Sequence, residues 1–392
     1  MSERQRRWGR PLAGALGIGV ALALLFLAVD ISSPARIAWE PTRLGEEPVL
    51  RAEGLVLQDR SGDTVWASRG YAIYRSRAWQ PFERVYEIRP RLGVAWAGFS
   101  RTFRNQLRYQ ELVEVVPLGG QRLLAFAGGD VYRLDLGSGH QQRVHTLRYF
   151  GPGRGRGVMP HGVCRTPDGS IYYGEYATGD LGPGATIRIY RSPDGGAHWS
   201  IAHQFPPGSV RHVHSLQWDP YGRALWVTTG DRDAESRIGY SRDGARSFTW
   251  IGQGSQRFRA VDLVFLPDRV LWGMDPAPAV PSHVVSWMRA SGQLRISPQT
   301  LPSPAYYALP LGPERALLTL AERKAAVWLV APAGIRELLS WPVRPDPGRP
   351  HPAVRLRRSA AADGDGWLLL NPLRTRSDGA AIYRLREGTL PR

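Results

Sequence analysis

The feature that most restricts the fold of this chain is a short β-type segment that returns at regular intervals. Its clearest form is an aliphatic residue followed by Tyr-Arg, and it begins at Ile73, Val131, Ile189 and Ile382. Looser copies begin at Ile238, Val285 and Val327, so neighbouring copies lie 42 to 58 residues apart. A four-stranded propeller blade takes about 40–50 residues. The spacing predicts an all-β chain folded as a single β-propeller of seven four-stranded blades, with six or eight as the alternatives.

A second pattern lies upstream of three of these segments and supports the same fold. Each copy reads strand, turn, strand around a proline, and the prolines are Pro167, Pro220 and Pro267. Pro-Asp-Gly and Pro-Tyr-Gly favour turns, and the flanking aliphatic and aromatic residues suit strands packed on both faces. The chain holds 44 Gly and 32 Pro, a composition typical of many short strands joined by tight turns.

Closure of the ring needs a strand from the other end of the repeated region. The copy at Ile382 lies too near the C-terminus to complete a blade, so we expect a strand from about Val49 to Leu57 to complete it. Cys164 is the only cysteine, which excludes a disulfide within the chain and predicts a small buried hydrophobe at this position. Stability must therefore come from packing between blades and from closure.

The N-terminal residues predict a membrane anchor and a spacer. Arginines precede an uncharged run from Pro11 to Val29, and its nineteen residues at about 1.5 Å each match the thickness of a bilayer core. The basic flank predicts a cytoplasmic tail at 1–10 and a chain that is periplasmic or extracellular after it. A cleaved signal peptide is the alternative, although its apolar region is usually about 7–15 residues. The proline-containing segment 30–48 predicts a linker, and 49–392 the propeller.

The net charge of +17 is weaker evidence for a polyanionic partner than its size suggests. Lys324 is the only lysine among 51 basic residues, which indicates an overall preference for arginine rather than one basic patch. No nucleic-acid motif accompanies the charge, so we expect no nucleic-acid partner. The partners that remain are a saccharide, acidic or neutral, the membrane through residues 11–29, and another protein.

The repeat register predicts where a ligand would bind. In a propeller, the loops that enter the innermost strands and those that leave the second strands meet at one end of the central channel. Three residues fall at or near strand starts: His161, His214 and Asp262. Three acids follow second strands: Glu175, Asp231 and Asp275. Their neighbours Arg211, His212, Arg259 and Tyr176 are expected at the same rim.

These residue types favour saccharide chemistry. Arginine binds the carboxylate of an acidic sugar through paired hydrogen bonds, while histidine or a carboxyl group transfers protons. We expect Glu175, Asp231, His214 and His161 to be the catalytic candidates, with the other rim residues binding substrate. Structural hydrogen bonding by the histidines and turn capping by the aspartates are the alternatives. Because the nearby arginines repel a cation, we expect no metal and no cofactor.

A turn pattern connects this chain to a known superfamily. Ser192-Pro193-Asp194-Gly195-Gly196-Ala197-His198-Trp199 pairs an acceptor Asp with glycines and a Trp, and a degenerate copy runs from Ser241 to Phe248. The pattern resembles the Asp-box, or BNR repeat, of sialidase-like propellers, in which it fastens a blade away from the catalytic pocket. The run from Arg211 to Asp231 resembles a bacterial and archaeal group of that superfamily without an established activity.

The resemblance does not extend to the catalytic residues of sialidases. The family holds its substrate carboxylate with an Arg triad that begins in Phe-Arg-Ile-Pro, and the nearest match here, Ile88-Arg89-Pro90, is out of order. Three functions are therefore considered. The first is a propeller that binds an extracellular or cell-envelope saccharide, with or without hydrolysing it. The second is a lyase in which His214 or His161 removes a proton from a uronate held by Arg211 or Arg259, with a Tyr as proton donor, and the third is a non-catalytic protein scaffold.

Overall fold

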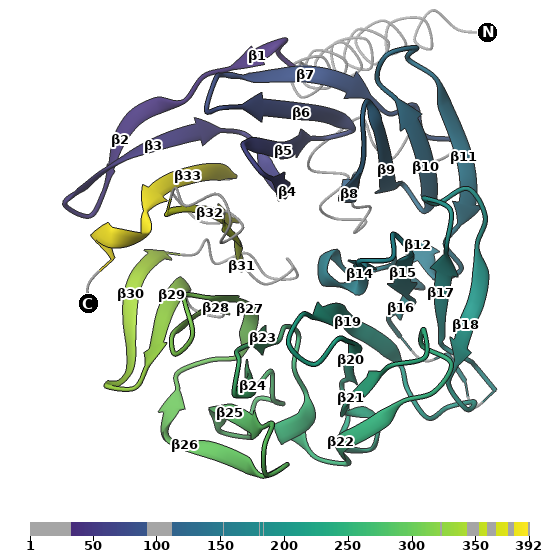
Figure 1. Cartoon of the computed structure of the whole chain (residues 1–392), viewed down its shortest axis with the longest axis vertical. Helices are drawn as coiled ribbons and strands as arrows, with labels where there is room; N and C mark the ends of the chain where they lie inside the picture. Colours follow the sequence, from purple (N-terminus) through teal and green to yellow (C-terminus); the bar gives the residue numbers. More distant parts are fainter. Residues whose placement is uncertain are drawn as a thin grey trace, which may run out of the picture.

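The antiparallel sheets are arranged in a ring around a common centre (Figure 1). The computed structural model describes residues 33–91, 112–342 apart from 152, 180, 183, 322 and 323, and then 353–358, 366–374 and 380–390. Within these residues the strands form seven sheets, and each sheet has a run of four hydrogen-bonded neighbours. The prediction of an all-β propeller is confirmed.

The sheets follow the chain in order, with the innermost strand first. The first sheet holds β4 (Val56–Ser61), β5 (Thr64–Arg69), β6 (Ala72–Arg77) and β7 (Phe82–Glu87). The second holds β8 (Leu112–Gly119), β9 (Arg122–Ala127), β10 (Asp130–Asp135) and β11 (Gln141–Thr146). The third holds β14 (Val163–Arg165), β15 (Ile171–Gly174), β17 (Arg188–Ser192) and β18 (Ser200–Gln204). The fourth holds β19 (His212–Asp219), β20 (Ala224–Gly230), β21 (Arg237–Ser241) and β22 (Thr249–Gln253).

The fifth holds β23 (Val264–Phe265), β24 (Arg269–Gly273), β25 (Ser282–Met288) and β26 (Leu294–Leu301). The sixth holds β27 (Ala305–Pro310), β28 (Ala316–Ala321), β29 (Lys324–Ala331) and β30 (Gly334–Pro342). The last holds β31 (Ala353–Arg358), β32 (Trp367–Leu373), β33 (Ala381–Arg386), β3 (Glu47–Glu53) and β2 (Glu40–Leu44). Short strands β12 (Phe150–Gly151), β13 (Gly155–Gly157) and β16 (Tyr176–Ala177) extend the fourth sheet beside β19.

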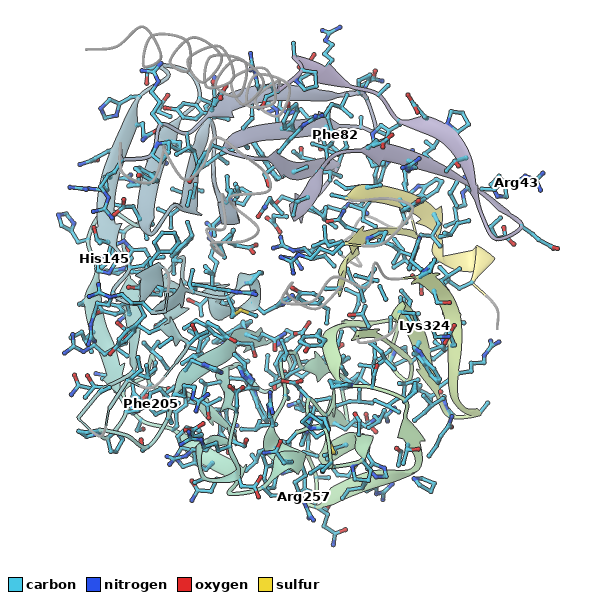
Figure 2. All side chains as sticks on the ribbon, turned by 180° about the vertical axis from the view of Figure 1, so that it is seen from behind. Arg43, Phe82, His145, Phe205, Arg257 and Lys324 are labelled. Atoms are coloured by element: carbon cyan, nitrogen blue, oxygen red, sulfur yellow. The ribbon has the colours of Figure 1, made fainter. Side chains whose placement is uncertain are left out.

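The repeated segment of the sequence is the third strand of every sheet. Its seven first residues, from Ile73 to Ile382, lie in β6, β10, β17, β21, β25, β29 and β33, and all seven are fully buried. Neighbouring sheets pack through such residues; Trp226 of β20 and Trp272 of β24, for example, share one buried cluster. Phe82 and Phe205 are fully buried, whereas the exposed Arg43 projects from the outer edge of the ring (Figure 2). Cys164 is buried, as predicted.

The last sheet is closed by the N-terminal part of the described chain. β3 pairs with β33, with Ala52 opposite Ile382. The expected strand is present, but it runs over 47–53 instead of about 49–57. Gly54, with φ +75°, reverses the chain after it, and Val56–Ser61 becomes the innermost strand of the first sheet. The left-handed backbone at this turn favours glycine.

The predicted spacer at 30–48 is partly strand. β1 (Arg36–Ile37) pairs with β7, and β2 pairs with β3, so both lie on the outer edges of sheets. The spacer prediction was wrong here because exposed outer strands carry too few apolar residues to show a strand pattern in the sequence. In the described part of the chain, no helix has the length and apolar character to cross a membrane. The anchor predicted at 11–29 lies outside the described residues.

The two Ser-x-Asp turns have the geometry expected of them. Asp194 accepts hydrogen bonds from the backbone N–H groups of Ala197 and His198, each at 3.0 Å. In the second turn, Asp243 accepts one from the N–H of Ser247 at 3.0 Å. A Cβ atom on Gly196, which has φ +83°, would overlap the side chain of Leu124 in the neighbouring sheet. These turns fasten outer hairpins and make no contribution to the site below.

Candidate functional site

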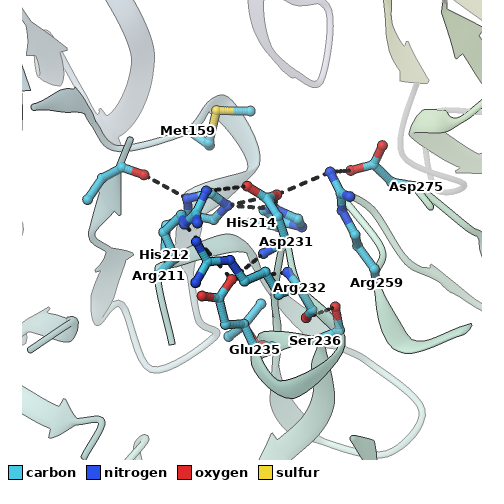
Figure 3. Close-up of polar contacts among 12 residues, drawn as sticks. Met159, Arg211, His212, His214, Asp231, Arg232, Glu235, Ser236, Arg259 and Asp275 are labelled. Carbon is cyan, nitrogen blue, oxygen red and sulfur yellow. Dashed lines mark hydrogen bonds and ion pairs between the residues drawn. The ribbon is translucent and has the colours of Figure 1, made fainter. Parts of the chain in front are cut away.

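A compact polar group forms where β19 begins and β20 ends (Figure 3). His212 and His214 lie two residues apart on β19, so both side chains face the same way. Asp231 directly follows β20, and it lies against both imidazoles. The register of the repeats correctly predicted that His214 and Asp231 meet.

Backbone carbonyls from neighbouring segments fix both imidazoles. His212 Nδ1 lies 2.7 Å from the carbonyl oxygen of Ala177, and His214 Nδ1 lies 3.0 Å from that of Ala260. A carbonyl oxygen only accepts hydrogen bonds, so each Nδ1 carries the proton and donates it. Both rings are buried, and Tyr176 stacks on His212 at 4.1 Å between ring centres.

This arrangement leaves the two Nε2 atoms facing each other. They are 2.9 Å apart, and each lies 3.3 Å from Oδ1 of Asp231. Because Nδ1 is the protonated nitrogen in each ring, a neutral pair would direct two lone pairs at one another. The contact therefore requires either one extra proton or a cation at the centre of the three ligand atoms.

The geometry suits a divalent cation. Two ligand atoms held cis at about 2.1 Å from one ion stand about 3.0 Å apart, close to the three distances observed. Histidine that ligates a metal usually donates its other N–H to a carbonyl or carboxylate, as both rings do here. Among the described residues, His212, His214 and Asp231 are the group able to hold a metal ion.

The carboxylates of this site offset the repulsion that the arginines would exert on a cation. Arg259 Nη2 lies 3.1 Å from Asp231 Oδ1 and 3.1 Å from Asp275 Oδ2. Arg211 lies at the longer distances of 3.6 Å from Asp231 and 3.9 Å from Glu235. Three carboxylates thus face two guanidinium groups, a formal charge of −1 when all are ionised. A divalent ion would leave the site with a net positive charge, which favours an anionic ligand.

Protonation differs sharply between the two aspartates of this site. Burial would raise the pKa of Asp231, but His212 and His214, which face its carboxylate, outweigh that effect and hold the pKa far below its usual range. Burial raises the pKa of Asp275 to about 6, although Arg259 opposes the shift. Asp231 is therefore a permanent anion, whereas Asp275 exchanges its proton near neutral pH.

Glu175 does not reach the site. It follows β15, where its carboxylate pairs with Arg148 at 3.3 Å and accepts the backbone N–H of Arg188 at 2.9 Å. Burial raises its pKa to about 7. The predicted position beside His214 and Asp231 was wrong, because the side chain of Glu175 faces Arg148, which follows β11 of the neighbouring sheet, and the backbone of Arg188 on β17.

His161 and Asp262 form a second group, just before the innermost strands β14 and β23. His161 Nδ1 lies 3.5 Å from Asp262 Oδ2, and its ring packs on Tyr307 at 4.6 Å. Asp262 also accepts the N–H groups of Leu263 and Ala308. His161 belongs to a 3-10 turn, η1 (Pro160–Gly162), that precedes β14, and this displaces it from the rim position of His212. The predicted single group is thus two groups.

Two residues of the site were not predicted. Glu235 ends the 3-10 turn η2 (Asp233–Glu235), and its Oε2 accepts the N–H groups of Asp231 and Arg232, both at 3.0 Å. Tyr306 lies on β27 and lines a cavity together with Arg259 and Asp275. Extending the proline-aligned hairpin to Pro310 would have placed Tyr306 beside the rim.

The comparisons with known proteins support the fold. Neither the protein-family models nor the curated proteins contain a match for this sequence. A solved oligogalacturonate lyase in complex with manganese has a TM-score of 0.58 at 10% identity, and the alignment covers 91% of this chain and 96% of that one. Another oligogalacturonate lyase, from Vibrio parahaemolyticus, has a TM-score of 0.55 at 9% identity over 90% and 98% of the two chains.

A third similar structure is the GH74 xyloglucanase from Xanthomonas campestris, with a TM-score of 0.52 at 17% identity over 87% of this chain and 54% of that one. Identities this low establish a shared β-propeller fold and no more. The resemblance to the Asp-box superfamily stays a prediction, because no family model matches.

Proposed function

We propose that this protein is a lyase that cleaves uronate-containing saccharides by β-elimination with the help of a divalent cation. The observation that carries the proposal is the pair of Nε2 atoms 2.9 Å apart beside an ionised Asp231, with Arg211 and Arg259 on either side. A lyase was the alternative to hydrolysis in the sequence analysis, and the similar manganese-bound oligogalacturonate lyase adds support.

His212, His214 and Asp231 would hold the cation, which when bound acts as a Lewis acid toward the substrate carboxylate. Two imidazoles with one carboxylate suit a first-row transition metal such as Mn²⁺ or Zn²⁺. The Nε2 atoms are then ligands and cannot serve as the base that was assigned to His214. His161 lies in the other group, 3.5 Å from Asp262, and the proposal does not assign it this role.

Asp275 is the best-placed base. It is buried, it lies 3.1 Å from Arg259, and its pKa of about 6 makes it a stronger base than an ordinary aspartate. In the proposed reaction, Arg259 binds the uronate carboxylate and Asp275 takes the proton from C5. The C4–O bond breaks, a C4=C5 double bond forms, and the departing oxygen receives a proton.

Hydrolysis is the second candidate, because the separated pKa values of Asp231 and Asp275 also suit an acid and a base. Asp231 is less suited to that role, since two histidines and two arginines already surround its carboxylate. The two reactions differ in product, because only elimination forms a double bond conjugated with the carboxylate.

The test uses the purified full-length protein, stripped with chelator and reloaded with Mn²⁺ or Zn²⁺. Incubation with a panel of uronate oligosaccharides should raise ultraviolet absorbance only after reloading, and His212→Ala and His214→Ala should each abolish the rise. His283→Ala is the matched control, since this histidine also bonds a backbone carbonyl, that of Ser297, but on β25 away from the site. New reducing ends without absorbance would establish hydrolysis instead; no cleavage of any saccharide by the reloaded protein would overturn both.

We also propose that the propeller works outside the cytoplasm, tethered by residues 11–29, on a cell-envelope or extracellular saccharide. The apolar run after an arginine-rich flank supports this location. Cell fractionation tests it: the full chain should sediment with membranes and be released once residues 1–30 are deleted, whereas a cytoplasmic, non-sedimenting full chain would contradict it.

A further inference from the structure

A cavity of about 440 Å³ adjoins the charged site, and it shares Arg259 and Asp275 with that site. Its walls are the segment after β24, residues 275–282, and the connection from β26 into β27, residues 301–306. A volume of this size lies within the range of small-molecule sites. A ligand bound by Arg259 could thus extend into this cavity.

The walls are rigid and carry hydroxyl groups. Five prolines line the cavity: Pro276, Pro278, Pro281, Pro302 and Pro304. Proline has a fixed φ and loses little conformational freedom on binding. Two residues with hydroxyl groups, Tyr306 and Ser303, also line the cavity. Apolar ring carbons and hydroxyls together match the faces of a sugar.

Tyr306 interacts electrostatically with Asp275 and Arg259, the two residues that the cavity shares with the charged site. It lines the cavity beside Arg259 and Asp275, whereas Tyr176 packs on His212 and is not among the lining residues. Burial raises the pKa of the Tyr306 phenol well above its usual value, so the hydroxyl keeps its proton at neutral pH. A protonated hydroxyl that lines the cavity can donate to an oxygen that enters it.

We infer that this cavity receives the sugar that departs during elimination, and that Tyr306 donates the proton to the departing oxygen. The inference rests on the proposed lyase function. The proton from C5 goes to Asp275, the electrons of the C4–O bond go to the departing oxygen, and the Tyr306 proton completes the new hydroxyl group. The phenolate then regains a proton from solvent before the next turnover. The substrate is accordingly an oligosaccharide whose 4-linked neighbour occupies the proline-lined cavity.

Two substrates distinguish proton donation by Tyr306 from a purely structural role of this residue. The first is a diuronide, whose leaving group is a sugar alkoxide. The second is a methyl uronoside with fluoride at C4, which loses fluoride without protonation and has no second sugar; a fluoride electrode follows its reaction. Tyr306→Phe should lower kcat on the diuronide by about 100-fold or more and change the fluoride reaction by less than about threefold. Tyr176→Phe should show no such difference between the substrates.

Blocking the cavity gives an independent measurement. Ala279 is exposed and lines the cavity, so Ala279→Trp should raise KM for the diuronide by about tenfold and leave KM for the fluoride substrate unchanged. Ala333→Trp, at an equally exposed alanine in the turn between β29 and β30, is the control. Equal losses on both substrates in Tyr306→Phe, or no change in KM in Ala279→Trp, would overturn the inference while the lyase function stood. A wild-type protein inactive on both would refute the lyase function itself.

Discussion

The side chain of Asn371 accepts a hydrogen bond from the backbone N–H of Leu57 at 2.8 Å, and so joins the last sheet of the ring to the first. Its amide nitrogen donates to the carbonyl oxygens of Leu55, at 3.0 Å, and Ala381, at 2.8 Å. Asn371 is fully buried. One amide thus satisfies three backbone groups of the closing seam that have no access to water.

Replacing this amide should weaken the seam strongly. In Asn371→Leu, three buried backbone groups lose their partner, at a cost of about 1–3 kcal/mol each. We expect the free energy of unfolding to fall by at least about 3 kcal/mol in a denaturant titration. Gln299→Leu is the matched control: Gln299 also bonds the N–H and carbonyl of one residue, Ile335, but at the surface. Equal losses in the two variants would contradict the prediction.

Gly196 should be the more restrictive of two adjacent glycines in the first Ser-x-Asp turn. Both have left-handed backbones, with φ +67° at Gly195 and +83° at Gly196, so alanine costs about 1–2 kcal/mol at either. Only at Gly196 would the added Cβ overlap Leu124; at Gly195 the nearest side-chain atom, from Leu118, is 3.8 Å away. Overpacking adds about 1–3 kcal/mol. Denaturation should therefore show Gly196→Ala to be the less stable variant, and the reverse order would argue against this packing.

Gly230 should control cation binding without supplying a ligand. A Cβ at this position would lie 2.5 Å from Cε1 and 3.1 Å from Nε2 of His214, so the ring must move. We expect Gly230→Ala to weaken Mn²⁺ binding by about tenfold or more in calorimetry, since the ligand geometry is lost. Gly184→Ala, where an added Cβ meets no atom within 4 Å, should bind like wild type. Unchanged binding in Gly230→Ala would speak against the His212–His214 site.

The pH dependence of cleavage should reveal Asp275. Its buried carboxyl has a pKa of about 6, and only the ionised form accepts the C5 proton. The value of kcat/KM should therefore be level above pH 6 and fall about tenfold per pH unit below it. The Arg259 charge lowers this pKa, so Arg259→Gln should move the acid limb to higher pH, whatever it does to the rate. If the acid limb of the pH profile lay at the same pH in Arg259→Gln as in the wild type, Asp275 would be excluded as the base.

The fold was predictable because its signal is repeated. Each third strand contains one repeat residue that is fully buried, and seven such residues at blade spacing leave few alternatives. The outer strands β1 and β2 gave no signal, because exposed strands need no apolar pattern. The closing strand was predicted from the need for closure, but its end depends on the turn at Gly54.

The sequence predicted the position of a site residue only where that position follows from the register of the strands. His214 and Asp231 met as expected because the start of β19 lies beside the end of β20. Register did not place Glu175, because its carboxylate pairs with Arg148 of the segment after β11, a contact between sheets that the repeat alignment does not contain. The bonds from His212 to Ala177 and from His214 to Ala260 span 35 and 46 residues and depend on loops of the neighbouring sheets. Those bonds fix which nitrogen carries the proton, and therefore whether the pair can bind a metal.

The pairing of β3 with β33 also sets the order of events during synthesis. Residues 47–53 leave the ribosome long before residues 381–386, because 328 residues separate Glu53 from Ala381. Throughout that interval the edge of β3 that will meet β33 has no partner, and such an edge readily joins other chains. The ring can close only after residues 381–386 have been synthesised, so protection of this one nascent edge decides how much of the protein assembles correctly.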